Sequence, residues 1–534
     1  GLSTLRMAME VSLSHALLLA SLLLLLYLLC YRGKNSSSNG NIPSPPALPV
    51  LGHLHLLKKP LHRSLAALAV RHGGGRGGAG LLLLRFGTRP VLLVSSPAIA
   101  EECFTVHDVA LADRPGLASR RLLSGDECPS IAGASYGPAW RHLRRIANVH
   151  ALSAHRLSLT TSARDAEARA MARKLWRATR LGAAAVSVKL TAYEYVANVI
   201  MAMVAGRRMA EDEVLRFKAM TEAGFAAAGA ANRHDFLPLL RLLDFGRTRR
   251  RLAGMAKERY EFGQSLVDEY RRIHHRHDAG GAATEDTTST PAQRTVIGDL
   301  LRQQEGSPEL YADVVIRTIC LSLLQAGTDT SSSTIEWAMA LLLNNPLVLV
   351  KAKEEIDVIV GTSRLLEERD LSCLPYLHGI ITETLRMYPI APHLAPHQAS
   401  SDCVVAGGRY IITCGTMMLV DVYSMQRDPT LWSDPDMFMP ERFEVDNDIA
   451  EDGDKQMVRI MPFGMGRRKC PGEGLAWRTV GVALGVMLQC FRWERMGKEE
   501  VDMREGSGFT MPMAMPLMAI CQPHEEMNEI LERI

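Results

Sequence analysis

The first strong feature of the hydropathy pattern is an unbroken apolar run at residues 11–31, dominated by leucine. About 20 apolar residues match the thickness of a bilayer core, so we predict a transmembrane helix there. A cleaved signal peptide and a buried helix are the alternatives. A cleavage site would need small residues just beyond the run, where Arg32 and Lys34 stand instead. These cations place the main domain on the cytosolic side.

The flanking segments divide the chain into four parts. Residues 1–10 precede the anchor, and we expect the protein to start at Met7 or Met9. Residues 32–49 change from a Ser/Asn/Gly linker to a proline-rich hinge, which proline stiffens by restricting φ. We expect the remaining residues, 50–534, to form one large catalytic domain.

Helical spacing of apolar residues dominates this domain. Two short strands, residues 81–86 and 90–94, are predicted to pair as a hairpin. Residues 157–277 have the pattern of successive amphipathic helices, a long and largely buried helix is predicted at 313–343, and a shorter helix at 377–387. The periodicity by itself therefore predicts a mostly helical domain.

Composition narrows the function classes. The chain is 47% hydrophobic and 22% charged, with a net charge of +3, which is too small to indicate nucleic-acid binding. Its ten cysteines are scattered and form no Cys-x-x-Cys pair. This argues against a zinc site and a disulfide framework, and it fits a reducing compartment.

The segment that carries the clearest chemistry is the glycine-rich, basic turn at residues 462–472, which contains Cys470. Glycine permits a tight turn and close approach to a flat partner. Three cations precede the cysteine, and a predicted helix follows it, so both features are expected to favour the thiolate. The alternative, a small buried core cysteine, requires neither the glycines nor the basic run.

This turn resembles the haem-ligating loop of the cytochrome P450 superfamily, whose pattern is Phe-x-x-Gly-x-Arg-x-Cys-x-Gly. The fixed positions of that pattern are matched by Phe463, Gly466, Arg468, Cys470 and Gly472. The resemblance implies that haem b is bound with Cys470 as the axial thiolate ligand of its iron. It also implies that Arg468 pairs with a haem propionate and that Phe463 packs near the sulfur.

The long predicted helix has an interruption at residues 326–331, where Asp329 lies next to hydroxyl side chains. Gly327 and the hydroxyls are expected to distort the helix locally. A carboxyl group in an apolar helix is costly unless it is satisfied or functional, so we favour a helix bend with a water-filled groove over a packing defect. The segment resembles the family's oxygen-activation motif, which implies that Thr330 hydrogen-bonds dioxygen or its proton-donating water and that Asp329 links this site to bulk protons.

Trp140 and Arg144 are four residues apart, so they share one face of a predicted helix. An arginine here is by default solvated, but the pair resembles the family's Trp-xxx-Arg element, which implies that both reach a haem propionate. The resemblance also places His397 near a propionate. An acidic redox partner and ordinary solvation are both open interpretations of four cations near the presumed proximal face: Arg141, Arg144, Arg145 and Lys469.

Glu383 and Arg386 share a helix face, and Arg442 lies in the later Pro-Glu-Arg-Phe segment. The order of these segments resembles the family's, which implies a buried charge network that holds the cysteine loop in place. Gln426 departs from the histidine of plant members. Residues 508–512 are expected to form a turn lining the pocket.

The resemblance spans nearly the whole chain and is nearest to plant microsomal members, in particular the isoflavone hydroxylase-like group. It implies a mainly α, triangular fold with a small β region, anchored by a single N-terminal helix in the endoplasmic reticulum membrane with the catalytic domain in the cytosol. It further implies insertion of one atom of dioxygen into a small apolar molecule, with electrons from NADPH through a separate membrane-bound reductase. The substrate would be a flavonoid, an isoflavonoid, another phenylpropanoid or a xenobiotic.

Two other classes remain open. A haem-thiolate isomerase or dehydratase would need neither dioxygen nor a reductase, but it would leave Asp329 and Thr330 unexplained. A non-catalytic haem sensor or carrier would not need a lid and a pocket.

Overall fold

The computed structural model describes residues 42–73, 80–124, 130–182, 185–228, 233–279, 295–444 and 460–534, with isolated positions between 14 and 25. The predicted membrane helix at residues 11–31 and the first part of the linker fall mostly outside these ranges, so they remain predictions.

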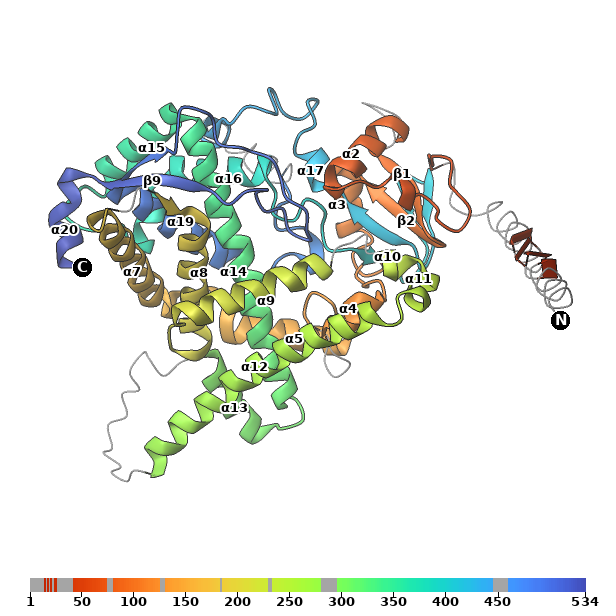
Figure 1. Ribbon diagram of the computed structural model, residues 1–534, viewed down its shortest axis with the longest axis horizontal. Helices are drawn as coiled ribbons and strands as arrows, with labels where there is room; N and C mark the ends of the chain where they lie inside the picture. The colour runs from red at the N-terminus through yellow and green to blue at the C-terminus, as the bar shows by residue number, and fades with distance from the viewer. Residues whose placement is uncertain are drawn as a thin grey trace, which may run out of the picture.

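The helical part of the fold is built around α14 (Asp313–Asn344), which packs against α8 (Val188–Ala205), α12 (Arg247–Ala279), α16 (Pro375–Met387) and α19 (Glu473–Cys490). Figure 1 shows α14 running through the middle of this layer of helices. Most side chains of α14 are buried, because apolar residues occupy nearly all of its faces. This helix and its neighbours hold the largest hydrophobic core of the described chain.

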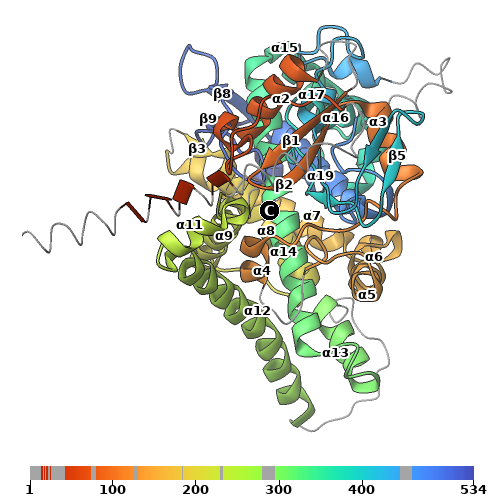
Figure 2. The same ribbon diagram turned by 90° about the vertical axis from the view of Figure 1, so that its right-hand side faces the viewer.

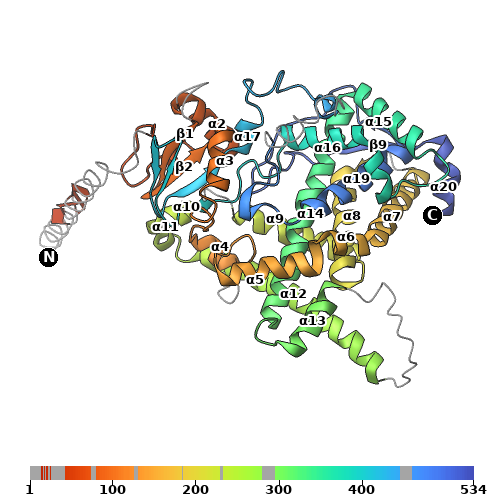
Figure 3. The same cartoon turned by 180° about the vertical axis from the view of Figure 1, so that it is seen from behind.

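Further helices surround these five. α12 and α13 project below the body (Figure 2), and α5 crosses next to α14 when the molecule is seen from behind (Figure 3). The remaining helices are α2 (Leu61–His72), α3 (Pro97–Thr105), α4 (Ala118–Ser124), α5 (Pro138–Ala147), α6 (Ala154–Leu159), α7 (Thr161–Arg180), α9 (Glu211–Ala227), α10 (Arg233–Phe236), α11 (Pro238–Leu243), α13 (Val296–Gly306), α15 (Pro346–Ile359), α17 (Val422–Met425) and α20 (Asn528–Arg533), with short turns η1 (Leu54–Leu56), η2 (Asn148–Leu152), η4 (Glu368–Cys373), η5 (Pro440–Phe443), η6 (Gly466–Arg468) and η7 (Glu525–Met527).

Three small sheets complete the described part of the fold. The first has the strand order β1-β2-β7-β4, in which β1 and β2 form the predicted hairpin and β2 runs parallel to β7. The others have the orders β3-β9-β8 and β5-β6. The strands are β1 (Leu81–Phe86), β2 (Arg89–Val94), β3 (Val186–Ser187), β4 (His397–Gln398), β5 (Cys403–Val405), β6 (Tyr410–Ile412), β7 (Met417–Val420), β8 (Phe491–Arg495) and β9 (Met518–Pro523).

The predicted distortion of the long helix does not interrupt it. α14 is a continuous α-helix through residues 326–331. Gly327 instead allows close packing, because a Cβ atom there would lie 2.5 Å from the Cδ1 atom of Ile200 on α8. The Thr330 hydroxyl donates to the Ala326 carbonyl at 2.7 Å, which is the back-bonding expected of a threonine in a helix.

Among the described helices, α8 is long and apolar enough to cross a membrane, and α14 with α15 would be so only as a sharply bent pair. α8 is largely buried against α14, so core packing accounts for its apolar sequence.

Candidate active site

The cysteine turn lies just before α19 and is closed by a hydrogen bond in which the Cys470 amide donates to the Phe463 carbonyl at 2.8 Å. Gly464 and Gly466 have φ values of 70° and 68°, a region that favours glycine. At Gly466 the backbone is also crowded, since a Cβ atom would lie 2.5 Å from the Phe104 carbonyl oxygen. Glycine at this position is therefore required by both conformation and packing.

Two of the three cations before Cys470 are paired with carboxylates. Arg467 pairs with Asp108 at 2.8 Å, and Lys469 pairs with Glu473 at 2.7 Å. Burial raises the pKa of the Cys470 thiol, and the Gly472 amide, Arg144 and Lys469 only partly oppose this. Lys469 thus favours the thiolate in the direction that the sequence predicts, but desolvation is the larger effect in the protein alone. Cys470 nevertheless keeps accessible surface.

Arg468 joins the cysteine turn to the segment before α5. Its guanidinium donates to the carbonyls of Ala112 at 2.8 Å and Ala134 at 2.6 Å, and it lies 4.5 Å from the ring centroid of Trp140. The Trp140 indole N–H donates to the Ile131 carbonyl at 3.1 Å. Trp140 therefore serves as a platform for guanidinium groups, and its own donor is already engaged by the backbone.

A further arginine that the sequence analysis did not single out belongs to this cluster. Arg114 is buried and donates to the carbonyls of Ala395 at 2.5 Å and Pro396 at 2.8 Å, just before His397. Burial and the neighbouring Arg468 hold the pKa of Arg114 well below its usual range. The position of Arg114 in an Asp-Arg-Pro triplet gave no physical signal of this, because only the fold brings it to the cysteine turn.

Arg144, on the same helix as Trp140, completes the cluster. Burial lowers the pKa of Arg144, and burial lowers the pKa of Arg468 to about 10. The Nδ1–H group of His397 donates to the Leu111 carbonyl at 2.7 Å, and burial and Arg114 hold the pKa of His397 well below its usual range, so it is neutral. Within the described residues, none of the three arginines forms an ion pair with a carboxylate.

This donor set fits haem. One buried and two half-buried guanidinium groups, none with a carboxylate partner among the described residues, are suited to bind anions, and the two haem propionates are such anions. Cys470 offers an exposed sulfur ligand, and a Cβ atom at Gly472 would lie 3.8 Å from that sulfur, so glycine there leaves the sulfur uncovered. The residues present therefore meet the two chemical demands of the group, an axial ligand and a counter-charge.

The acid and the hydroxyl predicted on the long helix lie on α14 as expected. Asp329 is 4% exposed, and its Oδ2 atom accepts a hydrogen bond from the Thr510 hydroxyl at 3.0 Å. Burial raises the pKa of Asp329, and Lys189 and Thr510 oppose this in part. Ala326 and Thr330 keep accessible surface although α14 runs through the core, so this stretch of the helix is not covered by side chains.

The three charged residues of the expected network lie together behind the cysteine turn. Arg386 donates to both oxygens of Glu383, at 2.6 and 2.8 Å, and Arg442 donates to Oε1 at 3.2 Å. Arg386 also donates to the carbonyls of Gln426 at 2.9 Å and Pro435 at 2.8 Å. Glu383 and Arg386 have no accessible surface, so every charge of this pair is satisfied inside the protein.

Gln426, which departs from the family pattern, turns out to connect this network to the turn. Its side-chain amide donates to the carbonyls of Leu385 and Arg386 at 2.9 and 3.0 Å, and its Oε1 atom accepts from the Met461 amide at 3.1 Å. Met461 directly precedes the cysteine turn. A histidine has one donor and one acceptor in its neutral form, whereas the glutamine amide makes three bonds here.

A mainly helical fold with a cysteine turn, a cluster of arginines without a carboxylate partner among the described residues and a buried acid on the central helix is that of a haem-thiolate protein. The chain belongs to the cytochrome P450 family, because the family model for cytochrome P450 matches residues 42–517. It is therefore a monooxygenase with haem b as cofactor, which acts with dioxygen, a redox partner and a small-molecule substrate.

Similar proteins come from several plants. The chain is 41% identical to a (+)-piperitol/(+)-sesamin synthase of Sesamum radiatum, with 92% of each chain covered. It is 39% identical to an isoflavone 3'-hydroxylase of Medicago truncatula, with 91% of this chain and 93% of the relative covered. It is 36% identical to an isoflavone 2'-hydroxylase of the same plant, with 92% of this chain and 93% of the relative covered.

Proposed function

We propose that this monooxygenase oxidises a small aromatic plant metabolite of the flavonoid, isoflavonoid or wider phenylpropanoid class. The functions for which its relatives are named, isoflavone hydroxylation and sesamin synthesis, support this class. Aromatic side chains from separate elements also meet near Asp329. Phe509 lies 6.0 Å from Phe225 on α9, between ring centroids. An aromatic wall of this kind favours a flat aromatic substrate.

In this proposal Cys470 would bind the haem iron, and Arg114, Arg144 and Arg468 would hold the propionates with His397 beside them. Gly466 shapes the turn and Phe463 packs close to it, next to Trp477 at 6.0 Å between ring centroids. Haem bound through a thiolate supplies the electron donation that favours cleavage of the O–O bond, with one atom passing to the substrate and the other to water. Glu383, Arg386 and Arg442 act structurally, by holding the turn.

Asp329 and Thr330 deliver protons in this proposal, and their arrangement is the observation that carries it. A carboxyl whose pKa is raised by burial keeps its proton to a higher pH than a solvated one and can release it to a neighbouring hydroxyl or water. Such a pair is costly in an apolar helix. A haem isomerase, dehydratase or carrier would have no use for it.

The chain is organised, we infer, as an anchor at residues 11–31, a linker and hinge at 32–49, and a catalytic domain at 50–534 in the cytosol. We propose that the anchor holds it in the endoplasmic reticulum membrane. Apolar side chains exposed at the same end of the molecule support a second membrane contact: Val50 is 45% exposed, Leu239 63% and Phe245 82%. α11, which carries Leu239, lies near β1 and β2 in Figures 1 and 3.

The redox partner we propose is the NADPH-dependent P450 reductase of the same membrane. Exposed cations on α5 and in the cysteine turn support an acidic partner surface there. Arg141 and Arg145 are exposed, and the Lys469 side chain is 49% exposed although it pairs with Glu473.

The experiment is turnover in microsomes that contain the protein and a plant reductase, with NADPH and a panel of isoflavones, flavones, lignans and herbicides. We expect a hydroxylated or ring-closed product from at least one phenylpropanoid, dependent on both dioxygen and NADPH. Product formed without dioxygen would instead indicate an isomerase or dehydratase. Cys470→Ser must abolish the red-shifted absorption of the ferrous carbon monoxide complex, and survival of that band would overturn the assignment of the ligand.

A further inference from the structure

The segment that brings Thr510 to α14 is a hairpin, residues 504–514. Its two arms are joined by hydrogen bonds from the Gly506 amide to the Pro512 carbonyl and from the Ala514 amide to the Arg504 carbonyl, both at 2.8 Å. At its tip it carries Phe509 and Thr510. Phe509 and Thr510 are adjacent in the chain, but they contact different parts of the molecule.

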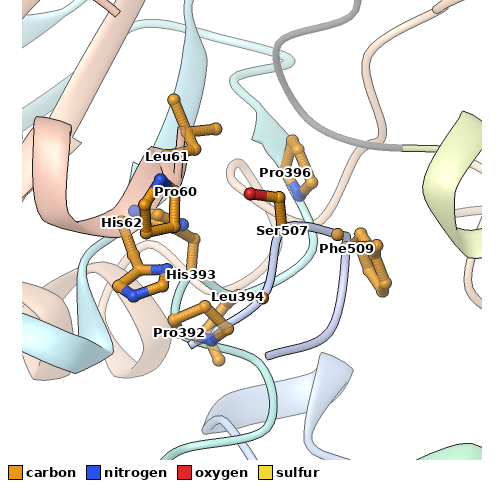
Figure 4. A pocket seen from close by; sticks show the side chains of 11 residues that line it. Pro60, Leu61, His62, Pro392, His393, Leu394, Pro396, Ser507 and Phe509 are labelled. Atoms are coloured by element: carbon orange, nitrogen blue, oxygen red, sulfur yellow. The ribbon is translucent and has the colours of Figure 1, made fainter. Parts of the chain in front are cut away.

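The base of the hairpin is fixed to α2. Only 2% of the Glu505 side chain is exposed. Its Oε2 atom accepts a hydrogen bond from Nε of Arg63 at 2.5 Å and lies 3.8 Å from Nε2 of His62. A cavity of about 20 Å³, enough for one water molecule, lies between His62 and the hairpin. Figure 4 shows Ser507 between His62 on one side of this cavity and Phe509 on the other.

The tip is fixed equally well. The Met511 amide donates to the Ile390 carbonyl, and the Met511 carbonyl accepts from the Trp337 indole on α14, both at 2.9 Å. Thr510 is therefore held between two anchored points, and its hydroxyl reaches Asp329 at 3.0 Å with both side chains buried. These contacts fix the backbone on either side of Thr510, so its hydroxyl is held toward Asp329.

The charged groups near Asp329 do not compete for this role. Lys189 on α8 donates to Ser333 at 2.7 Å and lies 3.5 Å from Glu336. Lys218 and Glu222 on α9 pair with each other, and Tyr193 is the remaining titratable neighbour. In the described part of the chain, the Thr510 hydroxyl donates to the Asp329 carboxyl at Oδ2, which leaves Oδ1 as the second oxygen of that carboxyl.

Phe509, the neighbour of Thr510, faces the aromatic wall proposed for the substrate. Its ring lies 6.0 Å from that of Phe225, and the Arg120 guanidinium on α4 lies 5.9 Å from its centroid. α4 is itself linked to α14, because Arg259 donates to the Leu123 carbonyl at 2.7 Å and to Gln325 at 3.0 Å. A molecule packed against Phe509 would therefore act on the backbone that also positions Thr510.

We propose that Thr510 is a positioning residue for proton delivery, which holds the Asp329 carboxyl through Oδ2, leaves Oδ1 to hold and pass the proton, and couples this orientation to substrate contact at Phe509. This rests on the role proposed above for Asp329. Thr510 itself forms and breaks no covalent bond. It sets the fraction of reducing equivalents that reach the product, because a misplaced acid lets reduced oxygen leave as peroxide.

The test compares Thr510→Val and Thr510→Ser in the full-length, haem-loaded protein with reductase. Product formed per NADPH should fall about fivefold in Thr510→Val, the effect of one lost hydrogen bond, while peroxide rises and the carbon monoxide spectrum is unchanged. Thr510→Ser should restore the ratio. Thr328→Val is the matched control, because Thr328 is a fully buried threonine next to Asp329 whose hydroxyl has no partner.

A second readout does not depend on turnover. The hydrogen bond from Thr510 lowers the pKa of Asp329, so its loss should move the titration of that carboxyl to higher pH. The infrared carbonyl band of protonated Asp329, identified by its loss in Asp329→Asn, reports this directly. The pH profile of turnover should shift in the same direction, with Lys189, Lys218, Glu222 and Tyr193 unchanged.

The outcomes separate the two proposals. If Asp329→Asn leaves coupling unchanged, the role proposed for Asp329 is wrong. If Asp329→Asn uncouples the enzyme but Thr510→Val has wild-type coupling and an unshifted infrared titration, the positioning role of Thr510 is overturned. If both uncouple, Thr510→Val in the Asp329→Asn background should add no further loss.

Discussion

Two groups of arginines in this protein differ in whether a carboxylate of the chain balances their charge. Arg386 and Arg442 share the carboxylate of Glu383, and Arg386 has no accessible surface. Arg114 and Arg468 donate to backbone carbonyls, and no carboxylate pairs with either among the described residues. The first group is complete within the chain and is suited to a structural role. The second requires an anion from outside, and this is why it marks a cofactor site.

The largest expected effect comes from breaking the complete group. Glu383→Gln would leave two buried guanidinium groups without a counter-charge, so we expect a loss of about 3 to 5 kcal/mol of stability. Little folded, haem-loaded protein should be recovered, which absorbance and thermal unfolding will show. Glu444→Gln is the control, because its pair with Lys351 is 44% and 45% exposed and should contribute less than about 1 kcal/mol. Equal losses in both variants would contradict the contrast.

A second prediction concerns the incomplete group. In Arg144→Gln the protein without haem should keep its stability, because removal of one of several like charges relieves repulsion. The same change should speed loss of haem about tenfold, as expected when a charge-assisted bond is removed. Transfer of haem to an excess of an acceptor protein measures the rate. A destabilised apoprotein with normal haem retention would place Arg144 in the structural group instead.

The third prediction tests the link between the structural network and the cysteine turn. Gln426→Leu keeps the volume but leaves two carbonyls and the Met461 amide unpaired, so it should cost about 2 kcal/mol. Gln426→His should recover part of this. Thermal unfolding measures the stability, and the carbon monoxide spectrum reports whether thiolate ligation is lost. An unchanged protein would show that the three bonds are dispensable.

The smallest effect is expected at Asp421, a buried carboxyl whose partner is Ser424 and not an arginine. Burial raises its pKa to about 6. This folded-state pKa exceeds the value of about 3.9 in the unfolded chain, so the folded state binds the proton more tightly. Protonation of Asp421 therefore stabilises the fold fully below about pH 4, and this stabilisation is lost as the pH rises through about 6. Asp421→Asn should flatten the change in unfolding temperature between pH 5 and pH 7.5, by the equivalent of about 1 kcal/mol. An unaltered pH dependence would contradict this.

Much of the secondary structure follows from the sequence, because it depends on local periodicity. The helix predicted at 313–343 is observed at Asp313–Asn344, and the predicted strands at 81–86 and 90–94 pair as expected. The sheets that join distant segments were not predicted. β2 pairs with β7 across more than 300 residues, and single-sequence patterns do not encode such pairings.

The sequence by itself predicted the role of Cys470 as a haem ligand, since a pattern of fixed residues around one cysteine is a local property. It also determined that Asp329 and Thr330 share a helix. Only the tertiary structure decided which charges act where. Desolvation outweighs the basic run at Cys470, Arg114 reaches the cysteine turn from a distant loop, and Thr510 meets Asp329 across 181 residues. Burial and long-range contact set these energies, and both exist only once the chain has folded.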